Sequence, residues 1–127
     1  MILGVTGSRH PRSDRLVLRF ANFIKSNDVN VLHHGDCVGW DAQCATVASY
    51  LGVKVIAHPP NQDANRAFVE SDVVLDPRDY LQRNRDIVNA SEYMIAAPDG
   101  PERTRSGTWA TIRYSKKTGV RGVIWLD

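Results

Sequence analysis

Short apolar runs alternate with longer amphipathic stretches along almost the whole chain. Apolar residues recur at helical spacings in the longer stretches, which predicts helices at 13–24, 41–51, 80–90 and 107–118. The short runs predict strands at 1–6, 29–33, 53–57, 92–97 and 122–126. Strands that alternate with helices favour a parallel sheet with right-handed crossovers. We therefore predict an α/β fold: a doubly wound three-layer sandwich with a mainly parallel five-stranded sheet.

Residues 61–79 show the least regular pattern in the chain. They are polar apart from an apolar island at 73–75, and we expect a long loop with a short helix near 64–69. Long ordered loops in compact domains are often functional. The chain has no internal repeat and no linker composition, and its 127 residues match the usual size of one domain. We predict a single domain over residues 1–127.

Composition excludes several classes of protein. The chain has 43% hydrophobic and 24% charged residues, which is ordinary for a globular domain, and its net charge of +2 is too small to indicate a nucleic-acid coat. No apolar run is long enough to span a membrane, and there is no signal-peptide pattern. Cys37 and Cys44 lack a zinc-type spacing with histidines, so we expect no metal site and no cofactor. Cytoplasmic localisation with free thiols is the default expectation, and no membrane partner is expected.

Three glycine-containing turns follow predicted strands. They are Gly7-Ser8-Arg9, the turn that begins at Gly35-Asp36, and Ser106-Gly107-Thr108. The first turn of a helix has unpaired N–H groups and partial positive charge, and a small residue lets an anion approach them. Each turn alone fits a tight connection equally well. Since ligands of open parallel sheets bind beyond the carboxyl ends of the strands, the three together predict a phosphate site.

Further candidates lie near these turns. The predicted helix 80–90 carries Arg83, Asn84 and Arg85, and the two arginines cannot share one helix face. Which of them faces the site stays open at this stage. Asp36 or Asp41 could contact ribose hydroxyls, although a carboxylate at a helix start also stabilises the helix dipole. Trp109 could stack on a base or belong to the core.

The order of these motifs resembles a known superfamily. Gly7-Ser8-Arg9, the segment 34–41 (HGDCVGWD), Arg83-Asn84-Arg85, and Asp99-Gly100 with Ser106-Gly107-Thr108-Trp109 together resemble the SLOG superfamily of Rossmann-like domains. The similarity is greatest to its small stand-alone YspA-like branch, which is related to the DNA-processing protein DprA and to the Lonely-guy phosphoribohydrolases. It implies one SLOG-like Rossmann domain, a nucleotide or nucleotide-derived ligand, and a homo-oligomer, dimer or higher.

One departure from the hydrolase pattern favours binding over catalysis. The position of the catalytic glutamate of Lonely-guy enzymes falls on Thr111, which cannot act as a carboxylate. We therefore predict that the chain senses or sequesters its ligand. The alternatives are an N-glycosidase for nucleoside 5'-monophosphates, with Asp36, Asp41 and Arg83 as catalytic candidates, and single-stranded DNA binding. The predicted ligand-binding residues are Gly7, Ser8, Arg9, Gly35, Asp36, Asp41, Arg83, Asn84, Arg85, Gly100, Ser106, Gly107, Thr108 and Trp109.

Overall fold

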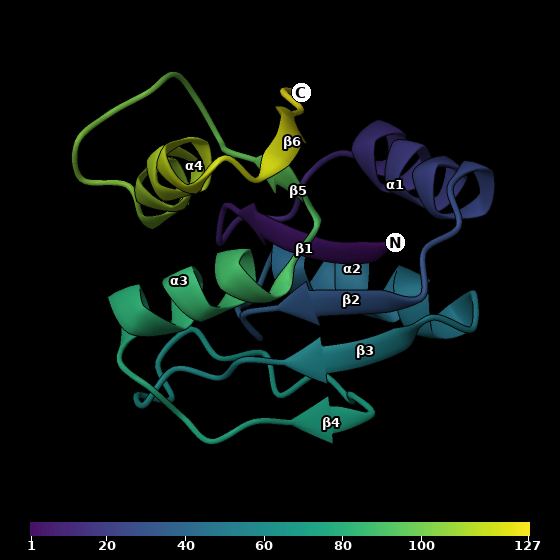
Figure 1. Ribbon diagram of the computed structural model, residues 1–127, viewed down its shortest axis with the longest axis horizontal. Coiled ribbons are helices and arrows are strands. Elements are labelled where there is room, and N and C mark those ends of the chain that lie inside the picture. Colours follow the sequence, from purple (N-terminus) through teal and green to yellow (C-terminus); the bar gives the residue numbers. More distant parts are fainter.

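A computed structural model describes residues 1–127 and contains one sheet of six parallel strands with four helices (Figure 1). The strands are β1 (Ile2–Gly7), β2 (Val31–His34), β3 (Lys54–Ala57), β4 (Val73–Val74), β5 (Tyr93–Ala97) and β6 (Arg121–Ile124). The helices are α1 (Asp14–Ser26), α2 (Trp40–Tyr50), α3 (Tyr80–Ala90) and α4 (Gly107–Thr118). The strand order is β4-β3-β2-β1-β5-β6, so the chain builds one half of the sheet and then returns to the other side of β1. The point where the order reverses therefore lies between β1 and β5.

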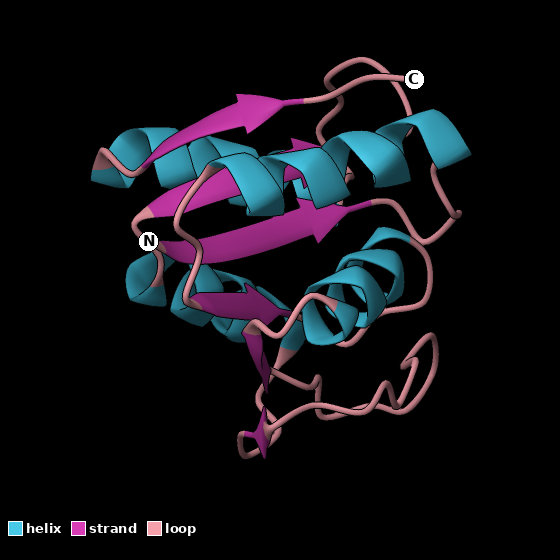
Figure 2. Cartoon of the chain, turned by 90° about the vertical axis from the view of Figure 1, so that its right-hand side faces the viewer, coloured by secondary structure: helices cyan, strands magenta, loops and turns pink.

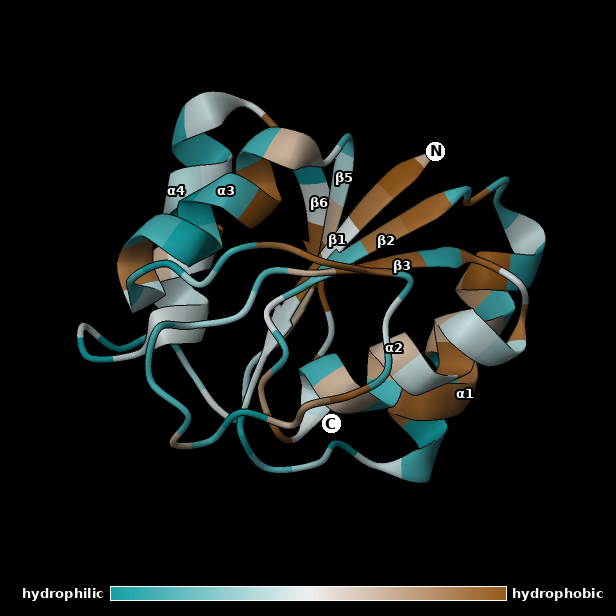
Figure 3. Cartoon of the chain, turned by 90° about the horizontal axis from the view of Figure 1, so that it is seen from below, coloured by the Kyte–Doolittle hydropathy of each residue, from teal (hydrophilic) through white to brown (hydrophobic).

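The helices form two layers on opposite faces of the sheet. Helices α1 and α2 lie on one face and α3 and α4 on the other, as Figures 2 and 3 show. This confirms the predicted α/β sandwich, but the prediction of five strands was one too few. The sixth is β4, in which Val73 and Val74 pair with Ile56 and Ala57 of β3.

The predicted helix at 64–69 was also wrong. The N–H of Ala67 donates to the carbonyl of Asp36, and the N–H of Val69 donates to the Asp36 carboxylate. These amides bond across to the β2–α2 turn instead of to carbonyls four residues earlier, so the segment follows the turn as an irregular strap.

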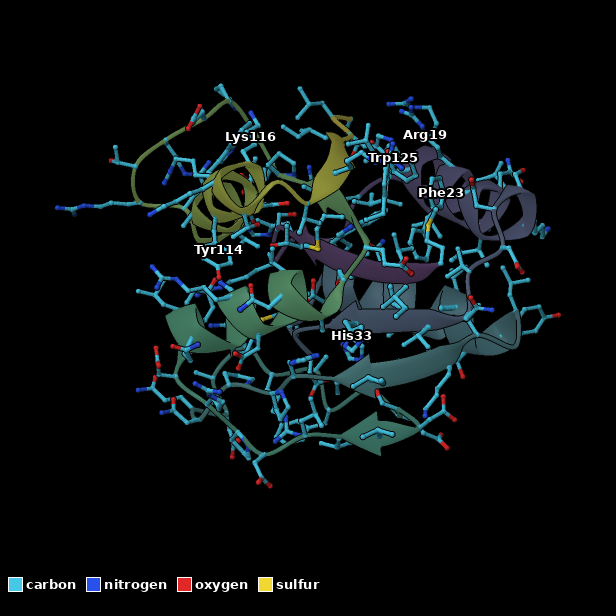
Figure 4. All side chains as sticks on the ribbon, in the orientation of Figure 1. Arg19, Phe23, His33, Tyr114, Lys116 and Trp125 are labelled. Carbon is cyan, nitrogen blue, oxygen red and sulfur yellow. The ribbon has the colours of Figure 1, made fainter.

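The larger part of the core lies between the sheet and α1 and α2. Alternation along β1 directs Leu3 and Val5 into this layer, where they join Leu16 and Phe20 of α1. At its rim Trp125 packs edge-on against Phe23, and Arg19 lies over the Trp125 ring; Figure 4 labels these three side chains. The opposite layer has smaller clusters. The well-packed face holds the carboxyl ends of β1 and β5 in fixed positions.

Local sequence sets the helix starts. Ser13, Asp79 and Ser106 cap α1, α3 and α4 by accepting backbone N–H bonds on their side chains. Helix α2 instead begins after Gly39, whose φ of 91° and close approach to the carbonyl of Ser8 exclude a side chain. No helix combines the length and the apolar character needed to cross a membrane.

Candidate functional site

A polar pocket of about 270 Å³ opens at the switch point between β1 and β5. We call it the anion pocket. Two of the three predicted turns form it, the one after β1 and the one that starts α4, because both strands end at the same edge of the sheet. Its lining residues are Gly7, Ser8, Arg9, His10, Tyr80, Asp99, Arg103, Arg105, Ser106, Gly107 and Thr108.

The turn after β1 presents free backbone donors. The N–H of Ser8 still donates to Ala97 O at 3.1 Å, and the Ser8 hydroxyl donates to His10 O at 2.6 Å, which folds the turn back on itself. The N–H groups of Arg9 and His10 have no acceptor within the protein. A side chain at Gly7 would overlap the buried ring of Trp40, so glycine lets the turn pack directly on α2.

The start of α4 presents two more free donors. Ser106 accepts the N–H of Trp109 at 3.2 Å and so caps the helix. The N–H groups of Gly107 and Thr108 have no acceptor within the protein and lie at the positive end of the helix dipole. Such a helix start attracts anions.

Three arginines surround these donors. Arg9 and Arg105 form no ion pair within the protein, whereas Arg103 donates to the carboxylate of Asp99 at 3.0 Å. The hydrogen bond from Arg103 lowers the pKa of Asp99, which is therefore ionised near neutral pH. The three arginines outnumber this single carboxylate, so the pocket favours an anionic group.

A second, larger pocket adjoins the anion pocket. We call it the loop pocket; it has a volume of about 410 Å³ and is lined by Arg9, Cys37, Pro60, Asn61, Gln62, Ala64, Asn65, Asp79 and Tyr80. Arg9 and Tyr80 line both pockets. The anion pocket and the loop pocket are therefore two compartments of one groove along the edge of the sheet.

Comparisons with known proteins place this geometry in a structural group. No protein-family profile matches the sequence, and no curated protein matches it. Among solved structures, the molybdenum cofactor binding protein from Rippkaea orientalis is 20% identical with a TM-score of 0.77, over 99% of this chain and 76% of that one. The Moco Carrier Protein from Chlamydomonas reinhardtii is 24% identical with a TM-score of 0.68, over 99% and 76%. DprA from Streptococcus pneumoniae is 21% identical with a TM-score of 0.70, over 96% of this chain and 49% of that one.

The chain has the same Rossmann-like α/β fold as these proteins. This is the fold that the order of the sequence motifs implied. At these identities the likeness concerns the fold, and the chemistry of the site has to be argued from the residues of this chain.

Arg83 lies behind the groove and does not line it. Its guanidinium is 2% exposed and donates to the carbonyls of Gly35 and His58 and to the side chain of Asn84. Asp41 is also buried and accepts the N–H of Gly35 at 3.0 Å. Burial raises the pKa of Asp41 to about 6, against the opposing effect of Arg83. The turn after β2 is therefore held by a buried polar network that does not line either pocket.

Asp36 ties the long loop to the end of β2. Its carboxylate is 1% exposed and accepts bonds from Arg66 Nε at 2.7 Å and from Val69 N–H at 2.9 Å. With both oxygens engaged, Asp36 fixes the strap that borders the loop pocket. Neither Asp36 nor Asp41 lines a pocket of the groove, so neither is placed to act on a bound ligand.

The remaining predicted residues lie outside the groove as well. The sequence left open which of the two arginines of α3 faces the site. In the structure neither lines the groove: Arg83 is buried, and the exposed Arg85 lies over the ring of Tyr114 on α4. Trp109 is 8% exposed, and its indole N–H donates to Gly100 O, so both residues anchor the β5–α4 loop. Figure 4 shows Tyr114 on the side of α4 that faces α3.

Sequence reasoning missed five residues of the anion pocket: His10, Tyr80, Asp99, Arg103 and Arg105. The two arginines carried a usable signal, since they directly precede the predicted phosphate turn in a polar loop. Tyr80 carried none. It begins α3, more than twenty residues from either turn, and only the fold brings it to Gly107, where a side chain would overlap its hydroxyl.

A cluster of buried histidines packs beneath the edge of the sheet that carries the groove. His33 Nδ1 lies 2.8 Å from His58 Nε2, and His34 accepts the N–H of Asp36 on Nδ1 while Nε2 bonds to Ser71 Oγ. Burial lowers the pKa of His34 and of His58 to about 4 each. Both side chains are thus neutral in the folded protein at pH 7, and protonation of His34 would cost it the bond from Asp36.

We expect the free energy of unfolding to fall as pH is lowered from 7 to 5. In the unfolded chain these histidines take up protons near their ordinary pKa of 6.5, whereas in the folded protein their pKa is only about 4. For His34 alone the loss is about 2 kcal/mol by linkage. Asp41, with its raised pKa, acts in the opposite direction, so the Asp41→Asn variant should lose more stability over the same range. Urea unfolding at both pH values measures this; a wild-type stability that rises toward pH 5 would contradict it.

Proposed function

We propose that this chain binds a nucleotide or nucleotide-derived small molecule and holds its phosphate in the anion pocket. The observation that carries the proposal is the convergence of four unpaired backbone N–H groups, from Arg9, His10, Gly107 and Thr108, with three arginine side chains around one pocket. Backbone donors and guanidinium groups are the usual partners of phosphate oxygens.

The neighbouring folds support a role in ligand binding. Two solved structures with this fold are named for binding or carrying the molybdenum cofactor, and a DprA structure from Helicobacter pylori is described by its single-stranded DNA binding mode. A small molecule is the better match for this chain. The anion pocket is a confined space of about 270 Å³, and the net charge of +2 is low for a protein that follows a nucleic-acid backbone.

The proposal is binding without turnover. A glycosidase needs a carboxyl group at the reacting sugar carbon, and the predicted carboxylates Asp36 and Asp41 are buried away from the groove. The two carboxylates that do line the groove have other partners: Asp99 accepts a bond from Arg103, and Asp79 caps α3. Thr111, at the position of the Lonely-guy glutamate, is 3% exposed, and its hydroxyl donates to Gly107 O at 2.8 Å inside α4. Its role is therefore helical packing.

Amide NMR tests the location of the phosphate. Titration with a nucleoside monophosphate should shift the backbone amide resonances of Arg9, His10, Gly107 and Thr108, since these N–H groups gain an acceptor. Amides of Gly52 and Val53, which precede β3 at the opposite edge of the sheet, serve as the internal control and should stay unchanged. Saturable shifts confined to other parts of the chain, or none at millimolar ligand, would contradict the proposal.

A further inference from the structure

The loop pocket differs in chemistry from the anion pocket that it adjoins. The carboxamides of Asn61, Gln62 and Asn65 line it, and none of these side chains forms a hydrogen bond within the protein. A carboxamide offers both donors and an acceptor. Arg9 is the one arginine that lines it, at the boundary with the anion pocket. The loop pocket therefore suits a neutral group with several hydrogen-bonding edges.

Tyr80 supplies an aromatic surface at the boundary between the two pockets. The Arg83 guanidinium carbon lies 4.8 Å from the Tyr80 ring centroid, and the hydroxyl reaches the start of α4 at Gly107. The buried guanidinium thus fixes the ring, which is 37% exposed. A flat heterocycle that leaves the anion pocket along the groove meets this ring first, and stacking on it needs no movement of the protein.

The chain around the loop pocket contains three residues in a costly backbone conformation, and one of them, Asn65, lines the pocket. Asp36, Asn65 and Phe68 have positive φ angles of 54°, 66° and 54°, and they are the only non-glycine residues of the chain that do. Such angles persist where surrounding contacts enforce them. Here the N–H of Val38 donates to Asn65 O at 2.9 Å, and Asp36 binds Arg66. The Asn65 carboxamide therefore projects from a pre-formed support.

We infer that the loop pocket is the compartment for the heterocycle of the ligand. The occupant is a nucleobase or another flat ring with donor and acceptor edges, read by Asn61, Gln62 and Asn65 and stacked near Tyr80. This rests on the proposed function, since the phosphate in the anion pocket places the ring. A volume of about 410 Å³ lies within the usual range for ligand pockets.

Calorimetry with three probes tests this inference: the best-binding of the four ribonucleoside monophosphates, ribose 5-phosphate and inorganic phosphate. The wild type should bind the nucleotide about 10-fold or more tightly than ribose 5-phosphate, because the base adds stacking. The Asn61→Ala/Gln62→Ala variant should weaken nucleotide binding by about 5- to 100-fold and leave ribose 5-phosphate unchanged. Both side chains are exposed, so this variant should fold. As the matched control, Arg105→Ala should weaken all three probes alike.

Two outcomes overturn the inference in distinguishable ways. If ribose 5-phosphate binds as tightly as every nucleotide, or if the double variant weakens both equally, the loop pocket does not hold the heterocycle, while the phosphate site stands. If none of the three probes binds, the proposed function fails and this inference fails with it.

Discussion

Replacing Arg9 by alanine is expected to weaken binding of a nucleoside monophosphate by about 10- to 150-fold, the equivalent of one lost charge-assisted hydrogen bond. Arg9 lines both pockets, and its guanidinium has no carboxylate partner, so it is free to meet the ligand. Its guanidinium offers a fork of donors to phosphate oxygens at the point where the two compartments join. The dissociation constant from calorimetry, at fixed salt, measures the effect.

Arg85→Ala is the matched control for this measurement. It removes the same charge from an exposed position on α3, where the guanidinium lies over Tyr114 and outside the groove. Its effect on affinity should stay within about twofold, since exposed charges outside the site act only through screened long-range fields. Equal losses of affinity in the two variants would mean that Arg9 acts only through its general positive charge, and would contradict a direct contact between Arg9 and the ligand.

Arg83→Leu should lower the free energy of unfolding by about 3–5 kcal/mol, as expected when one member of a buried charged network is removed. Arg83 is 2% exposed and donates to two backbone carbonyls, those of Gly35 and His58. Without it these buried acceptors lose their donor, and the buried Asp41 loses the cation that most favours its ionised form. Denaturant unfolding, with Arg85→Ala as the control expected to change stability by less than about 0.5 kcal/mol, measures the effect.

The pH dependence of this destabilisation separates a network role from simple loss of packing. The pKa of Asp41 is already raised to about 6 by burial, and loss of Arg83 raises it further. In the Arg83→Leu variant, the ionised Asp41 therefore destabilises the folded protein at pH 7. At pH 5 the Asp41 carboxyl group is protonated, and this destabilisation is absent. The stability difference between wild type and Arg83→Leu should shrink at pH 5, and Asp41→Asn should reduce the pH dependence of the difference. Part of it should remain, because Arg83 also lowers the pKa of His34 and of His58. A difference independent of pH in both backgrounds would contradict the network.

Local patterns were enough to predict the fold class and the two turns that line the anion pocket. Periodicity separates strands from helices, and a glycine turn between a strand and a helix start leaves free N–H groups wherever it occurs. That is why Gly7–Arg9 and Ser106–Thr108 were found. The homo-oligomer expected from the resemblance stays a prediction.

The parts of the site that the sequence did not predict depend on the path of residues 58–79. This segment is polar and aperiodic, and its course is fixed by bonds to residues far away in the sequence. Among them are the bonds to Asp36 and the pairing of Val73 and Val74 with β3. Its fold creates the loop pocket and delivers Tyr80 to the groove. The same lack of a local signal explains Asp36 and Asp41: a carboxylate that binds ligand and one that binds backbone look alike until burial is known.

Calorimetry of the wild type with a nucleoside monophosphate and with the same nucleoside lacking its phosphate tests the central claim most directly. We expect saturable binding of the monophosphate and a loss of about 10-fold or more in affinity when the phosphate is removed, because the free N–H groups and arginines of the anion pocket then have no anion to hold. Equal affinity for nucleoside and nucleotide, across all four bases, would contradict it.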